Sequence, residues 1–171
     1  MDKRWIYILI IFIVGFVALF YIVESSTTVG SAIVAVDKYL TTVPDSYNIE
    51  KSDHNYANFI NRETNERIMI ESVGKGDQVE KRLNEELDKL QNNVNITKIN
   101  ITTEKCDDII FSTVFYEKFN NSQNFNKIMV FEEFNHTFFL KATDFNNLDT
   151  LNEKAYFVID ALHQDFKKKQ D

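Results

Sequence analysis

The sequence predicts an α+β fold in which a mainly antiparallel sheet of six or seven strands is covered by two helices. Short runs rich in Ile, Val, Phe, Tyr and Thr recur between residues 43 and 143, and turn-forming residues separate them. Two longer stretches instead carry apolar residues at helical spacing. Because the strands follow one another through short loops, antiparallel pairing is favoured over a doubly wound sheet.

Seven runs are expected to form strands, in the order three strands, helix, four strands, helix. They cover residues 47–51, 56–61, 66–72, 95–103, 109–117, 127–134 and 137–143. Most show partial alternation, which is typical of a sheet with one buried face. The runs Ile128–Phe131 and Phe138–Leu140 are apolar at successive positions, so these two strands are expected to bury both faces.

The first helix is expected to begin near Asp77, because Asp77 and Glu80 have the spacing of a capping box. The second is expected over Asp149–Lys167, ending in a lysine cluster that suits the helix dipole. Each helix has one apolar stripe, formed by Val79, Leu83, Leu87 and Leu90 in the first and by Leu151, Ala155, Val158, Ile159, Leu162 and Phe166 in the second.

Composition narrows the class of protein. The 171 residues are 44% hydrophobic and 26% charged, which is enough apolar material for a core and argues against a disordered chain. Cys106 is the single cysteine, so no disulfide can form within the chain. The net charge of −7 argues against nucleic-acid binding, which needs a basic surface.

Residues 5–23 are expected to form one transmembrane helix that precedes the folded domain. This run of nineteen residues, from Trp5 to Val23, has no charged side chain. At about 1.5 Å per residue it spans about 28 Å, close to the hydrocarbon thickness of a bilayer. The alternative is a cleavable signal peptide, but its apolar region is normally shorter and followed by small residues, whereas Glu24 follows here.

The flanking charges predict the orientation of this signal anchor. Lys3 and Arg4 precede the span, and no basic residue follows it before Lys38. The positive-inside rule therefore places residues 1–4 in the cytoplasm and the rest outside a cell membrane that the chain crosses once. Residues 24–43 are expected to form a stalk, with a weakly amphipathic helix over 32–40. Residues 44–171 are expected to form the extracytoplasmic domain, and its acidity disfavours contact with anionic lipid.

The segment Val43-Pro44-Asp45-Ser46-Tyr47-Asn48-Ile49 resembles the opening motif of small secreted or membrane-anchored PsbP-like domains. In that motif Val or Leu precedes Pro, and an aromatic and then a β-branched residue follow. The resemblance extends over residues 43–168 as an order of strands and helices. It implies an α+β accessory domain for binding or assembly without a shared active site. It assigns no binding residue here, and fold alone does not carry over a photosynthetic role.

No motif in the sequence indicates a catalytic residue, a metal site or a cofactor. His136 lies near Glu132, Glu133 and Asn135, but a zinc site needs more ligands in fixed geometry, and a solvated turn explains them better. Residues 144–149 lack the oxygen ligand and glycine of a calcium loop, so Asn147 or Asp149 is expected to cap the last helix. The carboxylates beside Cys106 disfavour a thiolate.

Four sequons are candidate N-glycosylation sites on an extracytoplasmic domain. They begin at Asn95, Asn100, Asn120 and Asn135. Asparagine is frequent in this chain, so several such triplets are expected by chance. If Asn95 and Asn100 were both used, the strand that carries them would have to lie at an exposed edge.

The sequence favours a non-enzymatic binding or assembly module tethered to the membrane by residues 5–23, with an unknown protein partner or small ligand. An extracytoplasmic enzyme whose site forms only in the fold remains an alternative. A structural surface subunit that packs through its transmembrane helix is another, although Gly15 alone lacks the small-xxx-small pattern for such packing.

Overall fold

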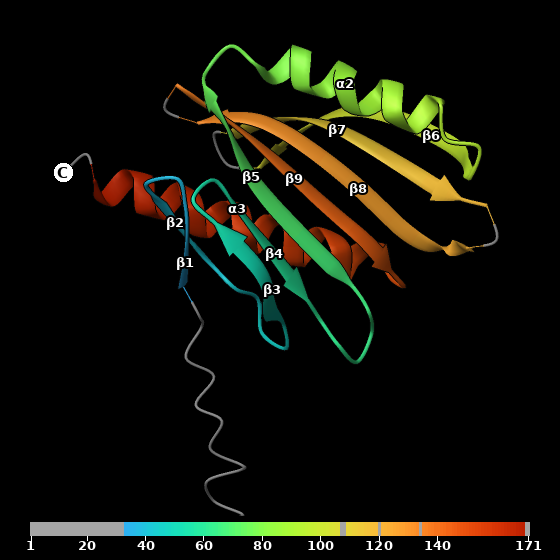
Figure 1. The fold of residues 1–171 in the computed structure, drawn as a ribbon, viewed down its shortest axis with the longest axis horizontal. Helices are drawn as coiled ribbons and strands as arrows, with labels where there is room; N and C mark the ends of the chain where they lie inside the picture. Colours follow the sequence, from blue (N-terminus) through green and yellow to red (C-terminus); the bar gives the residue numbers. More distant parts are fainter. Residues whose placement is uncertain (1–32, 107–108, 120, 134, 170–171) are drawn as a thin grey trace, which may run out of the picture. The chain divides into compact units, whose positions relative to one another are not determined.

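The computed structural model describes residues 33–106, 109–119, 121–133 and 135–169, except the side chains of 106 and 121–123. The described residues form a seven-stranded antiparallel sheet in the order β3-β4-β5-β9-β8-β7-β6 and a separate hairpin, β1-β2 (Figure 1). The strands are β1 (Ile33–Val36), β2 (Tyr39–Thr42), β3 (Asn48–Asp53), β4 (Tyr56–Ile60), β5 (Arg67–Lys75), β6 (Ile96–Cys106), β7 (Ile109–Lys118), β8 (Asn121–Glu133) and β9 (His136–Phe145). The helices are α2 (Val79–Gln91) and α3 (Leu148–Lys168).

The α+β class, the antiparallel sheet and the order of strands and helices from β3 onward are confirmed. β9 lies at the centre of the sheet, between β5 and β8, while β3 and β6 form its two edges. The expectation that β8 and β9 bury both faces is correct, since Ile128–Phe131 and Phe138–Leu140 are at most 1% exposed. The most apolar strands therefore occupy the middle of the sheet.

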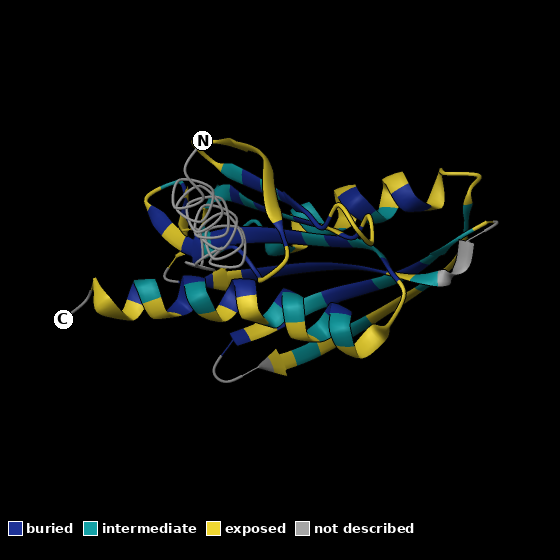
Figure 2. Ribbon diagram, turned by 90° about the horizontal axis from the view of Figure 1, so that it is seen from below, coloured by how far each residue is buried: buried dark blue, intermediate teal, exposed yellow. Residues whose placement is uncertain are grey.

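The two helices cover opposite faces of the sheet, which are called the α2 face and the α3 face below (Figure 1). The predicted stripe of α3 is buried along its whole length. On α2, Leu90 is buried, and Val79, Leu83 and Leu87 pack partly buried against the smaller cluster. Figure 2 shows the resulting pattern, in which the central strands are buried and the outer surfaces of the helices are exposed.

The start of α2 differs from the capping box predicted from Asp77 and Glu80. The helix begins at Val79, and its N-cap residue Gln78 makes no side-chain cap. The backbone N–H of Asp77 instead donates to Glu132 Oε2 at 3.1 Å, and that of Gln78 to Thr137 Oγ1 at 3.2 Å. Gly76 permits this approach, because a Cβ there would lie 2.5 Å from Glu132 Oε1. Side chains of β8 and β9 thus replace the local cap.

The helix predicted over residues 32–40 is wrong, because the structure forms the β1-β2 hairpin there. Its β-branched residues alternate between exposed and buried, as a half-buried strand requires, and Asp37 makes the turn with a φ of 59°. Tyr39 lies against Phe166 of α3, with ring centroids 3.8 Å apart. Thr41 Oγ1 donates to the carbonyl of Val158 at 2.8 Å.

The folded unit therefore begins before the boundary predicted at residue 44, since one compact unit covers Ser31–Asp171. The C-terminal part of the proposed stalk, residues 33–43, belongs to this unit. The predicted transmembrane segment, residues 5–23, lies outside the described residues. Within the part that is described, neither helix is long and apolar enough to cross a bilayer.

Candidate binding site

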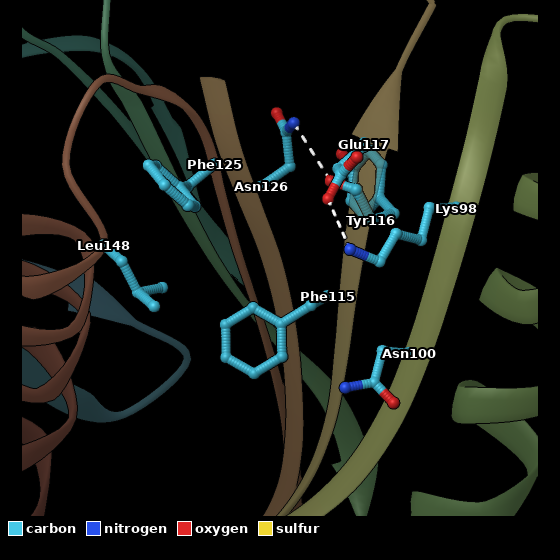
Figure 3. Close-up of a pocket in the computed structure, with 8 residues that line it drawn as sticks. All are labelled: Lys98, Asn100, Phe115, Tyr116, Glu117, Phe125, Asn126 and Leu148. Carbon is cyan, nitrogen blue, oxygen red and sulfur yellow. Dashed lines mark hydrogen bonds and ion pairs between the residues drawn. The ribbon is translucent and has the colours of Figure 1, made fainter. Parts of the chain in front are cut away.

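A groove of about 280 Å³ lies on the α3 face, where β6, β7 and β8 run past the first turn of α3 (Figure 3). Phe125 and Leu148 lie on one side of it, Phe115 lies in the middle, and Lys98 and Asn100 of β6 lie on the other side. Most of the lining is apolar. Phe125 is 38% exposed and Leu148 37%, although both are large apolar side chains. The site therefore offers apolar surface with polar groups at its edge, as ligand sites commonly do.

The groove lies beside the first turn of α3, whose first residue, Leu148, forms part of its lining. Asn147 caps the helix, since its side chain accepts from the backbone N–H groups of Asp149 and Thr150. The predicted cap at this position is confirmed. The sheet register shifts next to the groove, between Tyr116 and Lys118 and again between Phe125 and Lys127. Phe115 lies before the first of these shifts, so ordinary strand alternation places it on the same face as Phe111 and Thr113.

The charged groups at the groove neutralise each other. Lys98 Nζ lies 2.9 Å from Glu117 Oε1, and the two side chains are 67% and 38% exposed. An exposed pair of this kind contributes little to stability and is screened by salt. Tyr116 also contributes to the lining, but its side chain belongs to the cluster on the α2 face. The groove therefore presents no isolated charge at neutral pH.

A buried polar network lies beside the groove and holds Phe115 in place. Lys127 of β8 is fully buried, and its Nζ lies 2.7 Å from Glu104 Oε2 and donates to Asn152 Oδ1 at 2.9 Å. Tyr156 of α3 donates to the same Glu104 oxygen at 2.6 Å. The ammonium lies 4.9 Å from the centre of the Phe115 ring, within cation–π range. The network thus connects edge strand β6, central strand β8 and α3.

Two of the sequons lie at this end of the sheet. Asn95 is exposed immediately before β6, and Asn100 is exposed on β6 and lines the groove. β6 is an edge strand, as use of both sites would require. Asn135 is exposed in the β8–β9 turn with a φ of 61°, and Asn120 lies outside the described residues. A glycan on Asn100 would fill the groove, so glycosylation there and binding in the groove exclude each other.

The residues around His136 do not converge. Glu132 and Glu133 follow each other on β8 and therefore point to opposite faces. Glu132 contacts the start of α2, whereas Glu133 Oε1 lies 2.6 Å from Nδ1 of the buried His163 on α3. His136 Nδ1 lies 3.3 Å from the Tyr39 hydroxyl. Among the described residues, no group of three or more His, Cys, Asp or Glu is arranged to hold a metal ion.

The remaining candidate site residues from the sequence have structural roles, or their side chains are not among those that the structure describes. Asp144 pairs with Lys118 at 2.8 Å instead of contributing to a calcium loop. The side chain of Cys106 is not described. The groove itself was not predicted from the sequence, since Phe115, Phe125 and Leu148 come from three different elements.

The fold and the groove together define an α+β domain with an open apolar groove beside the first turn of α3. No protein-family model matches the sequence, and no curated protein matches it. Among solved structures, the PsbP protein of Synechocystis has a TM-score of 0.53 at 11% identity, covering 80% of this chain and 94% of its own. This likeness supports the predicted PsbP-like fold and, at such low identity, nothing beyond the fold.

Two structures of Mog1 also match. A Mog1 mutant has a TM-score of 0.49 at 10% identity, covering 80% of this chain and 94% of that one. Mog1p of Saccharomyces cerevisiae, described as Ran-binding, has a TM-score of 0.47 at 11% identity, covering 80% of this chain and 95% of that one. Neither similarity is strong enough to inform function.

Proposed function

We propose that this protein is a membrane-anchored accessory module without enzymatic activity, which binds a protein partner or small ligand outside the cytoplasm. The groove formed by Phe115, Phe125 and Leu148 is the observation that carries this proposal. Partly exposed aromatic and aliphatic side chains gathered in one concave site are typical of ligand and partner sites. The single ion pair at its edge, Lys98 with Glu117, supplies polar contacts without an acid–base function.

The membrane placement in this proposal depends on sequence alone. Residues 5–23 are apolar and long enough to span a bilayer, and Lys3 and Arg4 precede them. Residues 24–32 then connect this anchor to the folded unit. Residues 24–171 carry a net charge of −8, which disfavours contact with anionic lipid and leaves the domain accessible to partners.

The placement is tested by adding protease to intact cells that carry the full chain with a C-terminal tag. The domain is expected to be degraded from outside, and the chain is expected to stay in the membrane pellet after alkaline extraction. Loss of the N-terminal segment from the mature chain would favour a cleaved signal peptide instead. A tag that is degraded only after the membrane is permeabilised would show the opposite orientation.

The groove is tested by placing a photo-cross-linking amino acid at position 148 of the full chain in its native membrane. Position 153 is the matched control, because Glu153 is also near the start of α3 and its side chain is 70% exposed. We expect adducts from position 148 that the substitution Phe125→Ser diminishes, and none from position 153. The adduct mass separates a protein from a small ligand. Equal labelling from both positions, or none, would remove the support for the groove.

A further inference from the structure

Two of the chain's three histidines lie on either side of one carboxylate, that of Asp37 in the β1-β2 hairpin. His54, in the turn between β3 and β4, has its Nε2 3.7 Å from Asp37 Oδ1. His136, the first residue of β9, has its Nε2 3.9 Å from Asp37 Oδ2. The other ring nitrogen of His136 lies 3.3 Å from the Tyr39 hydroxyl. These contacts with Asp37 become ion pairs only when the imidazole rings carry a proton.

Asp37 holds the tip of the hairpin against the rest of the domain. It forms the turn between β1 and β2 with a φ of 59°, and its backbone N–H donates to the carbonyl oxygen of His54. Asp53 Oδ1 accepts from the backbone N–H of His54 at 2.7 Å, so a second carboxylate lies near this imidazole. The His54 side chain is 82% exposed and that of His136 is 17% exposed, so the His136 pair is the less screened of the two.

The charged groups on the neighbouring strands leave Asp37 as the carboxylate that responds to His136. Lys75 of β5 and Glu133 of β8 lie directly opposite His136 in the sheet. Lys75 is exposed, so solvent screens its charge. Glu133 Oε1 lies 2.6 Å from Nδ1 of His163, so this carboxylate is already engaged with a different histidine.

The remaining charges at the hairpin come from lysine and aspartate, which keep their charge between about pH 5 and pH 8. Lys38 Nζ and Lys169 Nζ lie 5.3 and 5.5 Å from the centre of the Tyr39 ring. Asp165 Oδ2 accepts from the backbone N–H of Leu40 at 2.9 Å and from Lys169 Nζ at 2.5 Å. These contacts attach the hairpin to α3 with the same charges throughout this pH range.

We propose that the β1-β2 hairpin is a pH-sensitive latch that His54 and His136 close on Asp37. Histidine is the side chain that ordinarily changes its charge between about pH 5 and pH 8. Protonated imidazoles attract the Asp37 carboxylate, so the hairpin is held most firmly at the acidic end of this range and opens more often as the pH rises. An open hairpin releases residues 33–42, which span about 35 Å when extended. The latch is independent of the groove.

The test measures amide hydrogen exchange in the full chain in detergent micelles at pH 5 and pH 8. Rates are corrected for the pH dependence of chemical exchange, and the amides of α2 serve as the reference. Relative to α2, we expect the hairpin to open about fivefold less often at pH 5 than at pH 8. Asp37→Asn should remove this difference while keeping the turn, because asparagine also adopts a positive φ.

Asp165→Asn is the matched control, because Asp165 also contacts the hairpin but does so through the backbone of Leu40 and through Lys169. It should make the hairpin open more often by a similar factor at both pH values and so keep the difference between them. The double substitution of His54→Gln with His136→Gln should abolish the difference, as Asp37→Asn does.

Three results would overturn the latch. The first is a wild-type hairpin that opens equally often at pH 5 and pH 8 relative to α2. The second is an Asp37→Asn variant that keeps the pH dependence, as Asp165→Asn is expected to do. The third is a double histidine variant that keeps it, since the response would then come from another group, such as His163. These results involve no residue of the groove and leave the proposed binding function unaffected.

Discussion

Lys127 and Lys141 lie on neighbouring central strands and point to opposite faces of the sheet. In the register of β8 and β9, Lys127 is opposite Ala142, and Lys141 is opposite Ile128. On the α3 face, the Lys127 ammonium is fully buried and has Glu104 at 2.7 Å. On the α2 face, burial lowers the pKa of Lys141, Glu86 opposes that change, and Lys118, Lys89 and Arg82 add to it.

The difference shows that a buried lysine is stabilised only where a carboxylate near it is not already paired with another cation. On the α3 face, Glu104 and Tyr156 are directed at Lys127. On the α2 face, Arg82 already pairs with Glu71 at 2.9 Å and with Glu86 at 3.3 Å. Lys89 engages Glu86 as well. Glu86, the carboxylate that acts on Lys141, is therefore shared with other cations, and the desolvation of the Lys141 ammonium is only partly offset.

The largest expected effect comes from breaking the network on the α3 face. Glu104→Ala leaves the Lys127 ammonium buried without this carboxylate, so the free energy of unfolding should fall by about 3–5 kcal/mol in chemical denaturation. The double substitution Lys127→Met with Glu104→Leu is the control, since an apolar pair of similar volume should recover most of the loss. A loss below about 1 kcal/mol for Glu104→Ala would mean that the pair is not desolvated as described.

The buried carboxylate of Glu66 has a neutral partner, the Tyr47 hydroxyl, where Glu104 has the charged ammonium of Lys127. Tyr47 donates to Glu66 Oε2 at 2.8 Å, and Glu66 is 7% exposed. Tyr47→Phe leaves that oxygen without this donor, so stability should fall by about 1–3 kcal/mol. The loss is expected to be smaller than for Glu104→Ala, because no buried cation is left behind. Thermal and chemical unfolding at neutral pH would measure it.

The same tyrosine gives a prediction for alkaline pH. Burial first, then the hydrogen bond and the charge of Glu66, raise the pKa of Tyr47 above its ordinary value of 10.0. The folded state then keeps a proton that the unfolded state loses, so stability from this group is complete below pH 10.0 and decreases above it. Tyr47→Phe should therefore lose less stability than the wild type on titration above that pH. If the stability of the variant and of the wild type changed in parallel with pH, the raised pKa of Tyr47 would be contradicted.

Lys141→Met should stabilise the protein by about 1 kcal/mol at neutral pH, because it removes a partly buried charge that lacks full compensation. The sign of the pH dependence is opposite to that of Tyr47. Since the pKa of Lys141 is lowered in the folded state, the unfolded state binds more protons as pH approaches 10.5 and the wild type gains stability there. The advantage of Lys141→Met should therefore shrink as pH rises. An advantage independent of pH would refute the lowered pKa.

The elements from β3 onward could be predicted because local patterns and tertiary packing agree in them. The apolar stripes of α2 and α3 and the doubly apolar runs of β8 and β9 all occupy the places that their spacing indicates. The β1-β2 hairpin could not be predicted, because its strands are only four residues long and depend on α3, which lies more than a hundred residues away in sequence. The capping box failed for the same reason, since distant Glu132 and Thr137 replace the local cap.

The groove and the polar networks could not be predicted from sequence patterns, because each one joins residues from elements that are distant in sequence. Lys127, Glu104 and Tyr156 come from β8, β6 and α3, and nothing in their neighbouring residues indicates that they meet. Phe125 of β8 and Leu148, the first residue of α3, meet only at the groove and stay 38% and 37% exposed. What a helix leaves exposed is set by its start and its path across the sheet, and periodicity does not encode that path.

The smallest expected effect comes from the exposed pair of Lys98 and Glu117 at the groove. Its nitrogen-to-oxygen distance of 2.9 Å is similar to that of the Lys127 pair, but Lys98 is 67% exposed and Lys127 is fully buried. Solvent screening should therefore limit its coupling energy to about 0.2–1 kcal/mol. A double-mutant cycle with Lys98→Met and Glu117→Gln would measure this coupling at low and high salt. A coupling of several kcal/mol that salt does not weaken would contradict the argument that solvent exposure makes this pair weaker than the buried pair of Lys127 and Glu104.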